Sequence, residues 1–290
     1  MNTTIKGTIY LLIAAAIWGF ALIAQKEGMT HLDAFSFTSI RCLLGGISML
    51  PLVWWRTKRN TEEERAASEK LHWKGALQCG IFLTALMLLQ QLGLPFTTVG
   101  KAAFITTLYI PITPLLERFT GKKIPRIIWL SGGVTMVGVY LLCFTDGLEG
   151  FSIGDLCMVG AAFAASLQML SVDKWVKKVD AVKLSCYQFI VVGLICLPLT
   201  LIFSDITLDG ILASWIPILY AGLCSCGFGY TFQVIGQKYT SAARTAILLS
   251  METVFSLIAG LIFYREIMSP VEYLGCAVMF LGVVLSQKEN

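Results

Sequence analysis

Apolar segments of about 20 residues dominate this sequence, and short polar connections join them. A helix needs about 20 mostly apolar residues to cross the hydrocarbon core of a membrane. Of the 290 residues, 56% are hydrophobic and 14% are charged, whereas a soluble domain carries about 25% charged residues. We therefore expect an all-α integral membrane protein with ten transmembrane helices, near residues 7–25, 34–55, 75–94, 99–118, 126–144, 153–172, 181–203, 214–234, 242–262 and 270–286.

Basic residues gather in alternate connections. They follow the second, fourth and sixth segments: Arg56, Lys58, Arg59, Arg65, Lys70 and Lys74; Arg118, Lys122, Lys123 and Arg126; and Lys174, Lys177, Lys178 and Lys183. The connections after the fifth and seventh segments hold acids instead: Asp146, Glu149, Asp205 and Asp209. Because lysine and arginine favour cytoplasmic loops, we expect a multi-pass protein of the cell membrane with both termini cytoplasmic. The net charge of +4 reflects this bias, so no nucleic-acid partner is expected.

The nine cysteines all fall inside apolar segments, and none forms a CxxC pair. His31 and His72 lie in predicted loops, far from a second metal ligand. Helix packing is the favoured role for the cysteines, with disulfide or metal chemistry as the alternative, and we expect no cofactor and no metal. The apolar run after Lys6 is longer than the core of a signal peptide and no small-residue cleavage site follows, so it predicts a membrane helix.

The chain also contains an internal repeat. A shift of 147 residues places the first two segments on the sixth and seventh, and a shift of 142 places the third and fourth on the eighth and ninth. Identical residues then coincide: Gly7 with Gly154, Asp33 with Asp180, Gly46 with Gly193, Trp73 with Trp215, Gly80 with Gly222, Gln91 with Gln233 and, at a shift of 144, Gly138 with Gly282. Coincidence among apolar residues is the alternative, but the aligned Asp, Trp and Gln residues argue against it.

The repeat divides the chain into two expected domains, residues 1–147 and 148–290, of five helices each. Because five is odd, the two halves cross the membrane in opposite senses. Inverted repeats are typical of secondary transporters, whose substrate site lies near the midplane between the halves. This pattern favours a transporter over other membrane proteins.

Several short motifs accompany the repeat: Trp18-Gly19 in the first segment, Arg41 in "SIRCLLGG", Glu252 in "SMETV" and Glu266 in "FYREI". With these motifs the chain resembles the drug/metabolite transporter superfamily, in its ten-helix EamA-type branch. The resemblance implies a central cavity and a substrate among amino acids, their derivatives, sugars, polyamine-like compounds and drugs. Family patterns place proline after the glutamate of the ninth helix, but Thr253 stands there in this chain.

Two ionisable residues lie well inside predicted spans, Arg41 and Glu252. A charge at the centre of a membrane helix costs about 2.5–3.5 kcal/mol on insertion scales, so each is a candidate for coupling or gating. For Arg41 the alternatives are a structural clamp to neighbouring carbonyls and a contact with substrate or gate. For Glu252 they are a structural hydrogen bond and a cavity carboxylate that binds a cation or a proton.

Uncharged polar residues lie on the helices that the resemblance places around the cavity. With Glu252, the candidate substrate-binding residues are Trp18, Gln78, Gln91, Tyr109, Gln168, Tyr230 and Gln233, and Gln90, Thr106 and Tyr220 share these helices. Each could instead make an ordinary interhelical hydrogen bond. The glycines of "CGFGY" (226–230) favour close helix packing or a flexible gate over a nucleotide loop, because no strand precedes them.

We therefore expect a secondary transporter, not an enzyme, that moves a small metabolite by alternating access. An amino acid or related amphiphilic solute, moved outward, follows from the resemblance, and proton coupling through Glu252 is a hypothesis. The expected partners are the small-molecule substrate and membrane lipid. The alternative is a membrane-embedded enzyme or lipid-handling protein, which would bring clustered His, Asp or Ser residues to one interface.

Overall fold

The computed structural model describes residues 3–57, 62–97, 99–143, 152–265 and 269–288, and every regular element within them is helical. The elements are α1 (Thr3–Gly28), α2 (Ala34–Thr57), α3 (Glu62–Gly93), η1 (Leu94–Phe96), α4 (Val99–Thr106), α5 (Tyr109–Phe119), α6 (Arg126–Cys143), α7 (Ile153–Trp175), α8 (Ala181–Phe203), α9 (Leu208–Ala213), α10 (Trp215–Leu219), η2 (Tyr220–Gly229), α11 (Tyr230–Gln237), α12 (Ala242–Leu249), α13 (Glu252–Tyr264) and α14 (Pro270–Ser286). The prediction of an all-α protein is confirmed for these residues. Glu266, Asp146 and Glu149 lie outside the described residues.

Within the described residues, eight segments are long and apolar enough to cross a membrane by length and composition. Of the other two predicted spans, the last corresponds to α14, which is apolar but has 17 residues. The remaining one, near 99–118, is divided into α4 and α5. Large apolar side chains such as Leu201 and Ile202, each 71% exposed, cover the outside of the bundle, as expected for a surface in contact with lipid.

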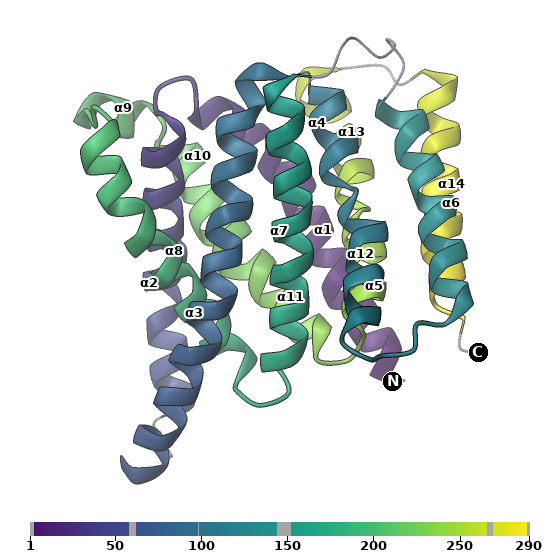
Figure 1. Cartoon of the computed structure of the whole chain (residues 1–290). Coiled ribbons are helices and arrows are strands. Elements are labelled where there is room, and N and C mark those ends of the chain that lie inside the picture. Colours follow the sequence, from purple (N-terminus) through teal and green to yellow (C-terminus); the bar gives the residue numbers. More distant parts are fainter. Residues whose placement is uncertain (1–2, 58–61, 98, 144–151, 266–268, 289–290) are drawn as a thin grey trace.

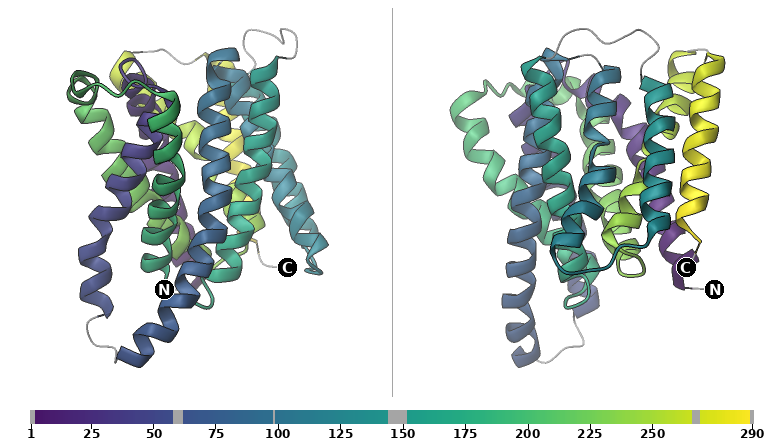
Figure 2. Two further views of the ribbon diagram at one scale, coloured as in Figure 1. Left: turned by 60° about the vertical axis from the view of Figure 1, so that its left-hand side comes forward. Right: turned by 45° about the vertical axis from the view of Figure 1, so that its right-hand side comes forward.

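The helices form one bundle with two recognisable ends. We call the end at which α1 begins and α14 finishes the inner end, and the opposite one the outer end (Figure 1). α6 and α14 pack together at one flank, and α2 and α8 at the other (Figure 2). The start of α3 extends beyond its neighbours at the inner end. The remaining long segments fill the centre between the two flanking pairs.

The flanking pair α2 and α8 is fastened at both ends by aspartates that begin the two helices. Asp33 accepts hydrogen bonds from two backbone N–H groups of the first turn of α2, and from Ser204 Oγ just after α8, at 2.6 Å. Asp180 caps α8 in the same way and pairs with Arg56, near the end of α2, at 2.8 Å. Burial opposes ionisation of Asp33, but hydrogen bonds from Ser204 and Ser36 outweigh it and lower its pKa below the usual range.

Glycines allow the flanking helices to approach closely. A Cβ at Gly46 of α2 would meet Ile190 and a backbone carbonyl of α8, and a Cβ at Gly193 of α8 would meet Leu43 of α2. The other flank repeats the arrangement: Gly138 of α6 faces Met279, and Gly282 of α14 faces Thr135. These contacts explain why glycine occupies matched positions in the two halves.

Two spans are broken near their middles, between α4 and α5 and between α12 and α13. At each break a hydroxyl bonds a carbonyl three residues earlier: Thr107 Oγ1 donates to Phe104 O at 2.6 Å, and Ser250 Oγ to Ile247 O at 2.7 Å. Such bonds compete with the helical ladder and bend helices. Pro111 also removes a donor from the first break, whereas the second break forms without proline next to Glu252.

The span that carries "CGFGY" changes helix type along its length. It begins as α10, continues as the ten-residue π-helix η2 and finishes as α11. π-Helices are rare and are found mostly as single turns at functional sites. The motif thus lies inside a helical segment, with its glycines in the π-helical part.

Candidate functional site

A cavity of about 80 Å³ lies among the central helices. Its lining comes from α1, α2, α3, α4, α5, α7, η2, α11, α12 and α13, so both halves of the chain contribute. The polar side chains that line it are Trp18, Gln25, Arg41, Gln90, Thr106, Tyr109, Gln168, Ser225, Tyr230, Gln233 and Glu252. Leucine, methionine and alanine complete the wall, so the cavity has both polar and apolar surface.

The structure brings most of the predicted site residues together at this cavity: Trp18, Arg41, Tyr109, Gln168, Tyr230, Gln233 and Glu252. Gln78 lies elsewhere, because its side-chain oxygen accepts hydrogen bonds from Trp175 and Lys174 at the inner end of α7. Gln91 is not in the lining either, but its amide donates to Gln25 Oε1 at 2.9 Å.

Gln25, which does line the cavity, was not among the predicted residues, and neither was Ser225. Gln25 stands three residues before the end of α1, in the polar run "QKEG". A polar run after an apolar segment is typical of the end of a membrane helix, so it does not indicate a cavity residue. Ser225 lies in the π-helix η2, whose altered helical repeat changes which residues face inward. Neither position carries a periodic signal that could have revealed it.

Two aromatic rings pack against each other at the wall of the cavity. The Trp18 and Tyr230 ring centroids lie 4.3 Å apart with the rings tilted by 50°, and Phe189 packs edge-on against Tyr230 at 5.0 Å. Trp18 comes from the first half of the chain and Tyr230 from the second. Their contact therefore joins the halves at the wall of the cavity.

Several buried polar atoms around the cavity have no hydrogen-bond partner in the described part of the structure. They are Trp18 Nε1, Arg41 Nε, Tyr109 Oη and Gln233 Oε1. A buried polar group without a partner costs about 1–3 kcal/mol, so such groups are rare in native proteins and call for an explanation. Because they share one cavity, these atoms are available to hydrogen-bond a polar molecule that enters it.

Arg41 is buried, with 3% of its surface exposed, and its guanidinium lies over the Phe37 ring at 5.4 Å. Among the described residues, no carboxylate lies within ion-pair distance of it. A buried cation is stable only when it is paired or hydrogen-bonded. Arg41 is therefore able to bind an anionic group that enters the cavity.

Glu252 begins α13, directly after the break that follows α12. Its carboxylate makes no hydrogen bond or ion pair within the described residues, and it lines the cavity. The partial positive charge of a helix N-terminus favours a carboxylate in the first turn. Because it bonds no described neighbour, the acid is available to a cation or a proton that enters the cavity.

A layer of amides forms the floor of the cavity toward the inner end. Gln233 Nε2 donates to Gln168 Oε1 at 3.2 Å and to Gln237 Oε1 at 3.3 Å, and Gln237 Nε2 donates to the Met169 carbonyl at 3.0 Å. Gln168 donates in turn to Gln188 at 3.4 Å. These bonds tie α7, α8 and α11 together directly beneath the cavity.

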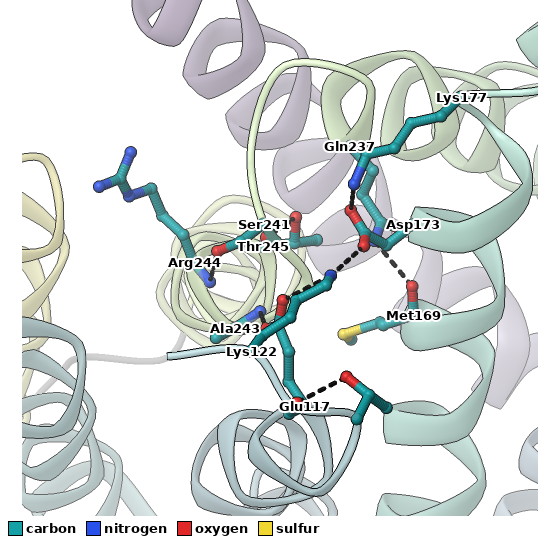
Figure 3. A network of polar contacts seen from close by, with 11 residues as sticks. Glu117, Lys122, Met169, Asp173, Lys177, Gln237, Ser241, Ala243, Arg244 and Thr245 are labelled. Carbon is teal, nitrogen blue, oxygen red and sulfur yellow. Dashed lines mark hydrogen bonds and ion pairs between the residues drawn. The ribbon is translucent and has the colours of Figure 1, made fainter. Parts of the chain in front are cut away.

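A layer of charged residues lies beyond these amides, at the inner end (Figure 3). Lys122 bonds both Glu117, at 3.0 Å, and Asp173, at 2.7 Å. Lys177 also pairs with Asp173, at 2.8 Å, and the Ala243 N–H at the start of α12 donates to the second oxygen of Glu117 at 3.1 Å. Burial opposes the charged form of Lys122, but the hydrogen bonds to Asp173 and Glu117 outweigh it and raise its pKa.

Comparison with known proteins identifies the family to which this chain belongs. The model of the EamA-like transporter family matches residues 5–144 and 152–287. The chain belongs to this family. An EamA-like transporter is a multi-pass membrane protein that acts on a small-molecule substrate, so the cavity is the natural place to look for its binding site.

Individual relatives agree with the family assignment. An uncharacterized transporter of Archaeoglobus fulgidus is 24% identical over 280 residues, which cover 95% of this chain and 83% of the relative. The uncharacterized transporter YwfM of Bacillus subtilis is 26% identical over 297 residues, covering 97% and 94%. One solved crystal structure is similar with a TM-score of 0.80 over 97% of this chain and 96% of that chain, at 14% identity, which shows the fold alone.

Proposed function

We propose that this EamA-like transporter is a secondary transporter that moves a small amphiphilic metabolite across the cell membrane by alternating access. The observation that carries the proposal is the cavity between the halves, where unpartnered polar groups accompany one buried cation and one free carboxylate. Transport without chemistry needs such a site, accessible in turn from each side. The relatives, which are named as transporters, favour this function over a membrane-embedded enzyme.

Reciprocal packing supports the proposal that the halves are inverted five-helix repeats of residues 1–147 and 148–290. Gly80 of α3 faces α8, and its repeat mate Gly222 of η2 faces α2. The aspartate caps and the glycines of the flanking pairs are reciprocal in the same way. Each of these contacts thus has a counterpart in the other half, which is the relation expected of a two-fold axis between repeats. The two ranges matched by the family model support the same division.

Arg41 and Glu252 together favour a substrate that carries both an anionic and a cationic group. Arg41 would bind the anionic group, since a guanidinium matches a carboxylate through two parallel hydrogen bonds. Glu252 would bind the cationic group, and the aromatic and aliphatic wall would receive an apolar side chain. An amino acid or a close derivative has this combination.

The cavity volume of about 80 Å³ is small beside the roughly 300–1,000 Å³ of sites for drug-sized ligands. We infer that this conformation is contracted and that the cavity widens when a substrate enters.

The proposal also includes the direction, the orientation and the coupling of transport: the substrate is exported, both termini are cytoplasmic, and Glu252 couples transport to a proton. Proton coupling follows from competition, because a buried site that holds one carboxylate accepts either a proton or the substrate cation.

The test uses purified protein in two steps. A panel of amino acids, amines, sugars and organic acids is first screened for thermal stabilisation, since a ligand that binds the folded state raises its stability by mass action. Hits are then tested as labelled solutes for saturable uptake into proteoliposomes. We expect zwitterionic amino acids to stabilise the protein and to be transported, whereas their amides and amines should do so weakly.

Matched variants connect the result to the cavity. Arg41→Gln and Glu252→Gln should reduce the response to the hit, because each removes one charge from the lining. Gln78→Ala serves as control, since Gln78 is a polar residue of a central helix that lies outside the cavity. Equal stabilisation of all three variants, or no saturable transport of any solute, would refute the proposed site.

A further inference from the structure

The charged layer at the inner end connects the two halves of the chain. Glu117 and Lys122 belong to the first half, whereas Asp173 and the Ala243 N–H belong to the second (Figure 3). Four segments therefore meet there: α5, the 120–125 loop, α7 and the start of α12. These bonds hold the four segments together at the inner end.

The two carboxylates are buried, with 1% of Glu117 and 3% of Asp173 exposed, whereas Lys122 is partly exposed to solvent. A buried carboxylate without its cation is unfavourable, so the network is either complete or opened to water. The exposed lysine is the member that can leave without itself becoming a buried charge. Its loop is therefore the movable part of the network.

Local geometry holds this loop over the carboxylates. Gly121 adopts a positive φ of 86°, a conformation that glycine enters without strain. It lies just after α5, where the Thr120 hydroxyl also bonds the Glu117 carbonyl at 2.7 Å. The turn directs Lys122 back onto Glu117 and across to Asp173, as a strap over the end of α5.

The outer end carries no equivalent of these acids at the positions that the repeat predicts. The repeat mate of Glu117 is Ala259, and the mate of Asp173 is Lys26. A symmetric transporter would close both ends with similar contacts. At these two matched positions the carboxylates of the inner end have no acidic counterpart.

We propose that Glu117, Lys122 and Asp173 form an ionic gate that closes the transport route at the inner end, with the 120–125 loop as its strap. This inference rests on the proposed transport function. Opening requires Lys122 to leave both carboxylates and releases the start of α12 from Glu117. Since α12 ends at the break before Glu252, the gate is one short helix away from the cavity carboxylate.

The test measures opening directly, by hydrogen–deuterium exchange of the full chain in lipid nanodiscs, without any substrate. The variants are Glu117→Gln, which keeps the shape but removes the charge, and Lys122→Met, which removes the exposed cation. Each should speed exchange of peptides covering α12 and the end of α5 by about tenfold, because a charge-assisted hydrogen bond is lost. Peptides covering α2 and α14 should be unchanged.

Glu69→Gln is the matched control. Glu69 also forms an ion pair at the inner end, with Lys183 at 2.5 Å, but it joins α3 to α8 away from the strap. Its loss should leave exchange of α12 at the wild-type rate. If Glu117→Gln does not yield folded protein, Lys122→Met decides alone, because its side chain is partly exposed and its removal leaves no cavity.

Transport assays then distinguish a gate from a network that only stabilises the inner end of the bundle. With a solute that the wild type transports, the gate variants should change the transport rate, whereas the control should not. Unchanged exchange in Lys122→Met, or faster exchange with a wild-type transport rate, overturns the gate. Absence of transport by the wild type itself would refute the transport function, and the gate with it, independently of the exchange data.

Discussion

Glu252 faces the cavity from the first turn of α13, and within the described residues its carboxylate bonds no neighbour. We predict that Glu252→Gln folds normally, because the amide keeps the shape and no structural bond is lost. The variant should lose affinity for a cationic substrate by roughly ten- to hundredfold, the effect of a charge-assisted hydrogen bond of about 1.5–3 kcal/mol, or lose the pH dependence of transport. Proteoliposome uptake from mildly acidic to mildly alkaline pH measures both.

Arg41→Gln is the companion variant, since it removes the opposite charge from the same lining. It should weaken binding of the anionic group and leave the pH dependence in place. A Glu252→Gln protein that transports like the wild type at every pH would make Glu252 a structural residue and end the coupling hypothesis.

The aromatic pair gives a second prediction for single residues. Trp18→Ala and Tyr230→Ala each remove one ring of a contact worth about 0.5–1.5 kcal/mol beyond burial, so both variants should stay folded with a modestly lower melting temperature. Transport should fall far more than stability, because the same rings form the cavity wall. Well-folded variants with normal transport would assign the rings to the scaffold.

Single residues also show where sequence reasoning about the site reaches its limit. The resemblance to EamA-type transporters placed Gln233 and Gln78 on helices around the cavity, and Gln233 does line it. Gln78 instead bonds Trp175, because the rotation of a helix about its axis is set by packing and cannot be deduced from polar residues spread around it. Glu117 and Asp173 were missed for another reason: they stand at helix ends beside basic residues, where charge is ordinary in any membrane protein.

N-terminal caps stabilise individual helices and can join them to their neighbours, as Asp180 does for α8. Asp180 accepts hydrogen bonds from the Val182 and Lys183 N–H groups, both at 3.0 Å, and pairs with Arg56 of α2. Asp180→Ala should destabilise the protein by about 0.5–2 kcal/mol, the usual cost of losing an N-cap, and lower its melting temperature. Asp205→Ala is the control, since Asp205 is exposed between α8 and α9 and caps no helix. Equal melting temperatures would show that α8 does not depend on its cap.

Breaks within helices were harder to foresee than the helices themselves. Thr253 stands where family patterns place proline after Glu252, yet the span is broken at Ser250 and Met251. The Ser250 hydroxyl, which bonds Ile247 O, accomplishes what proline does elsewhere. Serine is common in apolar helices, so the sequence alone does not predict the break.

At the scale of the whole molecule, the strongest sequence evidence lay in relations between distant positions. Matching Asp33 with Asp180 and Gly46 with Gly193 anticipated residues that the structure uses in reciprocal contacts. Such pairs are informative because a repeated fold needs the same cap and the same close approach twice. The gate falls outside this logic, since neither Glu117 nor Asp173 has an acidic residue at the matching position of the other half.

The orientation of the molecule can be tested independently of its mechanism. The positive-inside rule predicts that the connection after α2 faces the cytoplasm and the one after α6 faces outward. Thr61→Cys and Asp146→Cys, both outside the described residues, place a thiol in each connection. In intact cells, a reagent that cannot cross the membrane should label position 146 and not position 61. The nine native cysteines are free and lie within helices, so the unmodified protein supplies the background. Labelling at 61 but not at 146 would invert the orientation, and the Lys122 gate would then close the extracellular side.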